Sequence, residues 1–306
     1  MSVICFGELI IDFTSMNAGR QLWEVEKFQK NIGGAPANVA IGLYYHGIPV
    51  RLWSQVGNDS FGEFLLNRLN EHGLTTEGII RDPKHPTKLA FVGLDKNSER
   101  YFEFHNLNSA DLYMSTENYN PDKLIGAKVF HFGGVALLGE VTSITLFQIL
   151  KIAKQNQILV SFDPNFRIDL IKNKEVILKR FAEILTFVDI LKLSHDDWKH
   201  FFSSKIPQDI LRAGVSLLIL TKGEKGVQLI SAKSDVFVPA EEVSVVDTTG
   251  AGDAFMAAFL SKLIQNPVSP IGSISKDLLI EWGKFANYWA AKIIQYPGAV
   301  SAYFEK

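Results

Sequence analysis

Short apolar runs alternate with longer amphipathic stretches along most of the chain. The short runs, such as Val3–Phe6 and Leu159–Phe162, are typical of buried strands, whereas Ala35–Tyr45 carries the apolar spacing of a helix. We expect further strands at Arg51–Val56, Val129–Phe132, Ile190–Leu193 and Leu217–Leu220, and further helices at Phe61–Glu71, Ser143–Gln155, Glu175–Thr186 and Asp209–Ala213. This alternation predicts an α/β fold with a mostly parallel central sheet and helices on both faces.

Two segments, Phe13–Gln29 and Leu89–Asp111, interrupt the alternation because they are strand-like without helices between them. Asp95–Ser98 suits a hairpin turn. We expect one domain over residues 1–306, with a small β-sheet inserted from roughly 13–30 and 88–111 that serves as a lid over a ligand. The exposed edges of such a sheet favour pairing with a second subunit, which predicts a homodimer through the lid.

Composition narrows the classes of function. The chain has 306 residues, 47% of them hydrophobic, and a net charge of -2, which predicts a globular core and argues against nucleic acid or an anionic membrane as partner. Cys5 is the single cysteine, so no internal disulfide is possible, and we expect it to be packed in the first strand. Because no apolar run has membrane-spanning length and Met1–Gly7 lacks the basic start of a signal peptide, we expect a cytoplasmic protein.

The segment Asp247–Asp253 combines glycines and a carboxylate just before an apolar helical run. Gly250 and Gly252 let backbone amides turn toward an anion, and the helix start adds unpaired N–H groups. A carboxylate inside such a site, here Asp253, is suited to take a proton from an attacking hydroxyl. Aspartate is also a good helix N-cap, which is the commoner role for an isolated motif of this kind.

Two N-terminal motifs suit a polyol. Gly33 and Gly34 open a helix with Pro36 in its first turn, and the amide of Asn38 can both donate to and accept from a hydroxyl. Asp12 follows the first strand, where ligands of α/β sheets bind. Taken alone, each motif has a simpler interpretation, as a tight loop before a helix and as a solvated aspartate.

Three further motifs follow expected strands. Arg167 offers a planar donor fork to an oxygen-rich ligand, or forms a structural salt bridge. Thr221–Gly226 fits a nucleotide-contacting turn, or a plain β-turn before the next strand. The third motif either orients phosphate and hydrated magnesium or simply caps a helix, and it contains Lys192, Ser194 and Asp197.

In this order the motifs resemble those of the ribokinase-like, PfkB-type carbohydrate kinases, from Gly7 to Gly298. Gly33–Asn38 is similar to the first family signature and Asp247–Asp253 to the second. The segments most similar to fructokinases are Phe6–Phe13, Gly33–Ala40 and Asp163–Arg167. Related 2-keto-3-deoxygluconate kinases share the last of these, and there the arginine meets a substrate carboxylate.

The resemblance implies an ATP-dependent sugar kinase, most similar to a fructokinase. A 2-keto-3-deoxygluconate kinase or another PfkB-type sugar or nucleoside kinase remains an alternative. A non-catalytic sugar or nucleotide sensor on the same fold is the alternative from a different class, since fold does not fix function. A Rossmann dehydrogenase is disfavoured because Gly7-Glu8-Leu9, and not Gly-x-Gly-x-x-Gly, follows the first strand.

The resemblance also implies roles for the candidate residues. The general base is Asp253, and the anion hole is formed by the amides of Gly250, Ala251 and Gly252. The sugar is held by Asp12, Gly33, Gly34, Asn38 and Arg167, and lid side chains that select the acceptor include Phe91, Phe102 and Phe104. The ATP site contains Lys192, Ser194, Thr221, Gly223 and Gly226, with Asn287 near adenine. Magnesium is contacted through water by Asp197, and a possible potassium site lies around Asp247, Thr249 and Gly298. Where many members have Asn-x-x-Glu, this chain has Ser194-His195-Asp196-Asp197.

Overall fold

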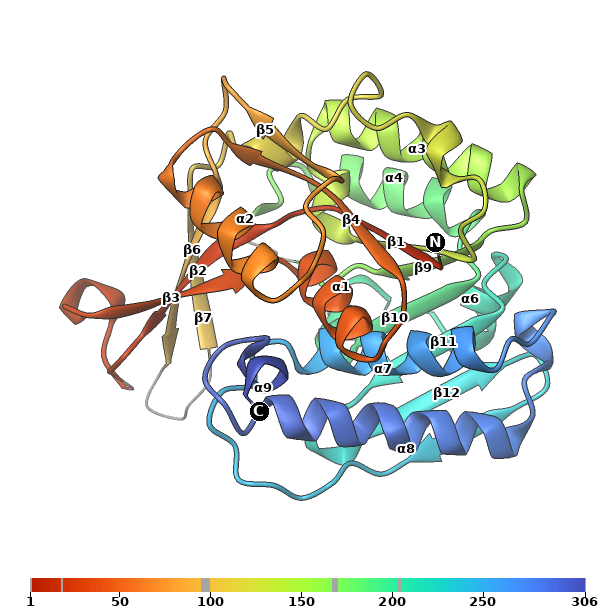
Figure 1. The fold of residues 1–306 in the computed structure, drawn as a ribbon. Helices are drawn as coiled ribbons and strands as arrows, with labels where there is room; N and C mark the ends of the chain where they lie inside the picture. Colours follow the sequence, from red (N-terminus) through yellow and green to blue (C-terminus); the bar gives the residue numbers. More distant parts are fainter. Residues whose placement is uncertain (1, 18, 95–99, 167–169, 203–204, 306) are drawn as a thin grey trace.

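The computed structural model describes residues 2–17, 19–94, 100–166, 170–202 and 205–305 (Figure 1). Its main sheet has nine strands in the order β13-β12-β11-β10-β9-β8-β1-β4-β5. The strands from β5 across to β11 pair in parallel, and β12 and β13 add an antiparallel edge. Their bounds are β1 (Val3–Phe6), β4 (Val50–Gly57), β5 (Ile79–Asp82), β8 (Val129–Gly133), β9 (Leu159–Asp163), β10 (Ile190–Ser194), β11 (Leu217–Thr221), β12 (Val227–Ser231) and β13 (Asp235–Val238). The mostly parallel sheet predicted from the sequence is confirmed.

Helices cover both faces of this sheet (Figure 1). One face packs against α1 (Ala35–Tyr45), α2 (Ser60–Glu71), α7 (Ala251–Gln265) and α8 (Lys276–Ile293), with α9 (Ser301–Phe304) beside them. The other packs against α3 (Glu140–Gln155), α4 (Lys174–Leu185), α5 (His195–Phe201) and α6 (Pro207–Arg212). Short 3-10 helices are η1 (Leu22–Glu24), η2 (Ala110–Leu112), η3 (Pro121–Leu124), η4 (Gly134–Leu137), η6 (Gly223–Lys225) and η7 (Ile271–Ser273). Among the described residues, no helix has both the length and the apolar character needed to cross a membrane.

The first strand shows why its sequence is continuously apolar. Val3 and Cys5 join the core on the α1 side, whereas Ile4 and Phe6 join the core on the α3 side. Side chains alternate across a strand, so a strand buried on both faces has no position left for a polar residue. Cys5 is fully buried, as expected.

A smaller sheet of four strands, in the order β3-β2-β6-β7, projects from one side of the main sheet (Figure 1). Its strands are β2 (Ile10–Ser15), β3 (Phe28–Gly33), β6 (Leu89–Leu94) and β7 (Arg100–His105). The antiparallel pairing of β6 with β7 is described, but the expected turn Asp95–Ser98 lies outside the described residues. The expectation of strand throughout Phe13–Gln29 is wrong in its middle. There Ser15 Oγ bonds to the backbone of Asn17, which turns the chain away from β2, and η1 follows.

Candidate active site

A cavity of about 1810 Å³ lies where the carboxyl ends of the main-sheet strands face the small sheet and the start of α7. This exceeds the roughly 300–1,000 Å³ of a pocket for one small molecule, so the cavity has room for two ligands. The candidate residues that line it are Asp12, Gly34, Asn38, Phe104, Lys192, Ser194, Asp197, Thr221, Gly223, Gly226, Thr249, Gly250, Ala251, Gly252, Asp253 and Asn287. Gly33, Asp247 and Gly298 are not part of this lining, and Arg167 lies outside the described residues.

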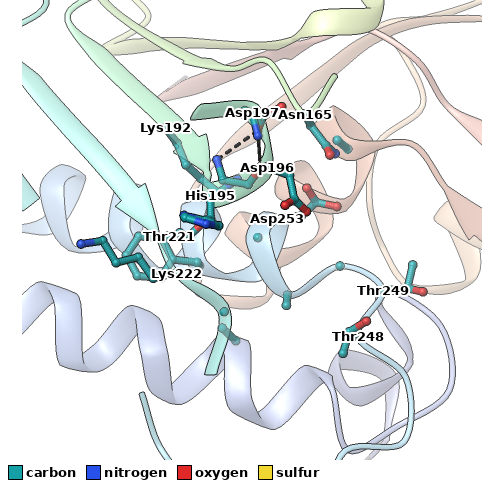
Figure 2. A pocket seen from close by; sticks show the side chains of 18 of the residues that line it. Asn165, Lys192, His195, Asp196, Asp197, Thr221, Lys222, Thr248, Thr249 and Asp253 are labelled. Carbon is teal, nitrogen blue, oxygen red and sulfur yellow. Dashed lines mark hydrogen bonds between the residues drawn. The ribbon is translucent and has the colours of Figure 1, made fainter. Parts of the chain in front are cut away.

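The start of α7 has the geometry of an anion site. Gly250 is the N-cap in the left-handed conformation, with φ of 80°, and a Cβ there would lie 2.5 Å from the carbonyl oxygen of Ala299. The first helical turn then leaves backbone N–H groups without partners inside the helix. Asp253 is the third helical residue, so its alternative interpretation as N-cap is wrong. Figure 2 shows its carboxylate facing the side of the pocket that carries Lys192 and Asp197.

The start of α1 brings the two N-terminal motifs to the same cavity. Asn38 Nδ2 donates a 2.8 Å hydrogen bond to Asp253 Oδ2, and Asn38 Oδ1 is buried with no hydrogen-bond partner among the described residues. Asp12 lies in β2 and is 6% exposed, so it is not a solvated loop residue. Its carboxylate covers Gly33, where a Cβ would lie 2.3 Å from Asp12 Cγ. The missing side chain of Gly33 therefore allows the Asp12 carboxylate to lie at the base of the cavity.

Glu8 is a buried acidic residue of the cavity that sequence reasoning missed. Its Oε1 accepts a hydrogen bond from the backbone N–H of Ala35 at 3.1 Å, and its Oε2 has no partner among the described residues. Burial raises the pKa of Glu8 to about 7, against the attraction of Lys88, which is itself paired with Asp111 at 2.5 Å. The signal available from sequence was one acidic residue directly after the first apolar strand.

Replacing Glu8 with Gln is expected to stabilise the protein at high pH. The folded state holds the Glu8 proton up to a pKa of about 7, whereas the ordinary value is 4.5, so the wild type loses stability as pH rises through this interval. The glutamine side chain never ionises, and the stabilisation of the variant should rise from near zero at pH 4 to as much as ~3 kcal/mol at pH 8. Urea unfolding at both pH values measures this difference. A difference that is independent of pH would contradict the raised pKa.

The ends of β9 and β10 contribute a buried ion pair. Lys192 Nζ lies 2.6 Å from Asp163 Oδ2, and burial raises the pKa of Asp163 to about 6 while the attraction of Lys192 opposes this rise. The sequence motif Asp163–Arg167 indicates a ligand contact for Arg167 but no role for the Asp163 carboxylate. Its partner lies 29 residues away, so only the pairing of the two strands brings them together.

The segment after β10 was expected either to orient phosphate and hydrated magnesium or to cap a helix. The structure shows the helix cap, formed by Ser194 and Asp197 at the start of α5. Ser194 Oγ accepts a 3.0 Å bond from the N–H of Asp197, while Asp197 Oδ2 accepts from Ser194 N at 3.0 Å. Asp197 Oδ1 also accepts from the N–H of Phe166 at 3.2 Å. Both residues nevertheless line the cavity, so the cap also fixes the Asp197 carboxylate at its wall.

Thr221–Gly226 is both a turn and part of the cavity wall. It joins β11 to the antiparallel β12, and Lys222 N donates to Gly226 O at 2.8 Å. Gly223 and Gly226 have φ of 57° and 115°, which glycine adopts most readily. Nearby, Asn287 Nδ2 donates to the carbonyl oxygens of Val238 and Pro239, at 3.2 and 2.8 Å, and so ties α8 to the end of β13.

The proposed cation-binding residues are joined by one carboxylate. Asp247 Oδ1 accepts from the N–H and hydroxyl of Thr249 at 2.9 and 2.5 Å, and Asp247 Oδ2 accepts from the N–H of Gly298 at 2.8 Å. The loop before α7 is thereby fastened to the C-terminal segment. Asp247 and Thr249 are both buried.

Two of the three aromatic side chains expected on the small sheet line the cavity. Phe102 and Phe104 are stacked with ring centroids 5.9 Å apart, and both belong to the lining. Phe91 is not part of it, because it packs on Phe13, with centroids 5.0 Å apart. In the pairing of β6 with β7, Phe102 lies opposite Val92 and Phe104 lies opposite Ala90. Phe91 stands between Ala90 and Val92, and because side chains alternate along a strand it lies on the other face of the small sheet.

A helix start with the geometry of an anion site, beside a buried carboxylate and opposite polar groups suited to a polyol, fits a phosphotransferase on an α/β fold. The model of the pfkB family carbohydrate kinases matches residues 1–305, and the chain belongs to this family. Both the fold class and the family expected from the sequence motifs are confirmed.

Relatives extend over nearly the whole chain. Fructokinase-1 of Zea mays is 34% identical over 303 residues, which are 97% of this chain and 93% of the maize protein. The crystal structure of a Xylella fastidiosa fructokinase with bound ATP has a TM-score of 0.88 and 29% identity, covering 98% of this chain and 94% of that one. A double mutant of a Vibrio cholerae fructokinase, with fructose, ADP and potassium bound, has a TM-score of 0.85 and 25% identity, covering 99% and 95%.

Proposed function

We propose that this carbohydrate kinase transfers the γ-phosphate of ATP to a hydroxyl of fructose. The observation that carries the proposal is the hydrogen bond of Asn38 to Asp253 at the anion-binding start of α7. It joins a group suited to a sugar hydroxyl to a group suited to accept its proton. The similarity to fructokinases with bound ATP, and with bound fructose and ADP, supports the choice of both substrates.

In the proposed reaction the sugar hydroxyl oxygen bonds to the γ-phosphorus while the bond to the bridging oxygen breaks. The electron pair of the broken bond stays with ADP, and the hydroxyl proton goes to Asp253. The N–H groups of Gly250, Ala251 and Gly252 stabilise the charge on the transferred group. Positioning and charge stabilisation supply most of the rate enhancement in such reactions.

The remaining candidate residues divide between the two ligands in this proposal. The sugar contacts Asp12, Gly34, Asn38, Arg167 and Phe104, whereas Gly33 makes room for the Asp12 carboxylate and has no direct contact with the sugar. The nucleotide contacts Lys192, Ser194, Thr221, Gly223, Gly226 and Asn287. The small sheet, which carries Asp12 and Phe104 on strands that border the cavity, acts as the lid.

Magnesium and potassium fit the residues present. Asp197 is fixed at the cavity wall by three backbone and hydroxyl donors, and a carboxylate has further acceptor capacity for metal-bound water. The fastened loop around Asp247, Thr249 and Gly298 offers oxygen atoms of the kind that hard cations prefer. Magnesium held near Asp197 would neutralise phosphate charge. Potassium held near Asp247, Thr249 and Gly298 would add positive charge behind the anion-binding turn at the start of α7.

A coupled ATP-consumption assay over fructose, ribose, 2-keto-3-deoxygluconate and nucleosides tests the function. Fructose should give the highest kcat/KM. A preference for 2-keto-3-deoxygluconate would instead favour the role of Arg167 as a carboxylate contact. If the protein bound sugar but consumed ATP with none of the acceptors, the sensor alternative would replace the kinase.

We also propose that two copies associate through their small sheets. Trp23 and Met16, on the segment between β2 and β3, are 84% and 64% exposed, so this end of the small sheet offers apolar surface to a second copy. Sedimentation equilibrium should give the mass of a dimer, and a monomer at micromolar concentration would refute this arrangement.

A further inference from the structure

Lys192 and Asp163 form an ion pair at the wall of the cavity. The two side chains are 5% and 1% exposed, and they stand on β10 and β9, which pair in parallel. Taking two charges out of water can cost more than their attraction returns, so a buried pair is weak evidence for a role in stability alone. The location of this pair suggests a further role.

The ammonium of Lys192 lies directly against the anion-binding turn. A Cβ on Gly252 would be 2.9 Å from Lys192 Nζ and 3.2 Å from its Cε. Burial alone would lower the pKa of Lys192, but the attraction of Asp163, Asp197 and Asp253 outweighs it and raises the pKa above its ordinary value. Lys192 is therefore a fixed positive charge beside the N–H groups of Gly252 and its neighbours.

Lys192 lies near the carboxylates of both Asp163 and Asp253, and its hydrogen bond goes to Asp163. Asp253 is also near enough to Lys192 to affect its pKa. An ammonium bonded directly to Asp253 would make that carboxylate a weaker proton acceptor. The 2.6 Å bond to Asp163 holds Lys192 on the β9 side, where its remaining protons are available to a ligand in the cavity.

We propose that Lys192 is a catalytic residue that contacts the oxygens of the transferred phosphoryl group, and that Asp163 is the positioning residue that holds it against the turn at Gly252. This inference rests on the proposed kinase function. Lys192 transfers no proton in the step. The hydroxyl oxygen bonds to phosphorus, the bond to ADP breaks with its electron pair left on ADP, the proton goes to Asp253, and Lys192 compensates the charge of the moving group.

Three variants separate this role from a structural one: Lys192→Met, Asp163→Asn and the double variant. The single Lys192→Met change leaves a buried carboxylate without its cation and is expected to destabilise the fold. The double variant removes both charges and should regain much of the lost thermal stability. A structural pair predicts that the double variant also regains kcat. Our proposal predicts that kcat stays about 100-fold or more below wild type.

Nucleotide binding supplies a second readout that does not depend on sugar turnover. Isothermal titration with ADP and with the non-hydrolysable β,γ-imido analogue of ATP should show unchanged ADP affinity in the double variant, but about tenfold or more weaker binding of the analogue. Asp163→Asn should show the same selective loss to a smaller extent, and Lys192→Arg should restore part of it. Equal effects on both nucleotides, or a double variant with near-normal kcat, would overturn the inference. If the wild type binds the analogue more tightly than the double variant does but phosphorylates no sugar, only the proposed function is contradicted.

Discussion

Replacing Asp253 with Asn is expected to lower kcat by about 10²–10⁴-fold, because the variant has no carboxylate to accept the hydroxyl proton. Asn keeps the size of the side chain, and its Oδ1 can still accept the 2.8 Å hydrogen bond that Asn38 donates. The start of α7 should also persist, since its N-cap is Gly250 and not Asp253. The affinities for fructose and ATP should therefore change little. Steady-state kinetics and isothermal titration with each substrate separate these two expectations.

A matched control is Asp277→Asn. Asp277 also lies in the first turn of a helix, α8, but it is exposed and is not part of the cavity lining. This variant loses one favourable charge at a helix N-terminus, worth about 0.3–1 kcal/mol in stability, and should keep the wild-type kcat. Near-normal turnover in Asp253→Asn would remove Asp253 from the mechanism, and equal losses in both variants would point to helix stability instead of proton transfer.

Local features of the site were predictable because each is decided within a few residues. Gly250 needs a positive φ to begin α7, and the cap formed by Ser194 and Asp197 spans only four positions. The apolar run Val3–Phe6 likewise reflects burial on both faces of one strand. Periodicity and capping chemistry act at this range, so the main strands, helices and loops could be placed from sequence.

Contacts between distant segments could not be predicted from local pattern. Asn38 and Asp253 meet across 215 positions, and Lys88 pairs with Asp111 across 23. Nothing in the periodicity of either segment specifies its partner, because these contacts depend on how α1, α7 and the small sheet pack. For the same reason the sequence indicates no role for Glu8 or Asp163. The alternative role of Asp253 as N-cap is wrong for a local reason, because Gly250, three positions earlier, takes that position. Only the resemblance to a known family indicated that these separate motifs form one site, because no local pattern joins them.

Replacing Gly34 with Ala is expected to cost about 3 kcal/mol or more of unfolding free energy. Gly34 is the N-cap of α1 with φ of 103° and ψ of 119°, a conformation that costs a residue with a side chain about 1–3 kcal/mol. A Cβ there would also lie 2.3 Å from the carbonyl oxygen of Glu8, and backbone atoms cannot move aside as a flexible side chain can. Relief of this contact would shift the start of α1, and with it Asn38. We therefore expect weaker fructose binding as well as lower stability.

Gly47→Ala is the control for the backbone conformation alone, because Gly47 follows the other end of the same helix. Its φ is 74°, yet a Cβ there would meet no atom within 4 Å. That variant should lose only about 1–2 kcal/mol, the ordinary cost of a left-handed residue, and should keep its affinity for fructose. Urea unfolding and isothermal titration on both variants measure the two effects. If Gly34→Ala lost no more stability than Gly47→Ala, the close approach of α1 to the Glu8 backbone would not be what fixes Asn38 beside Asp253.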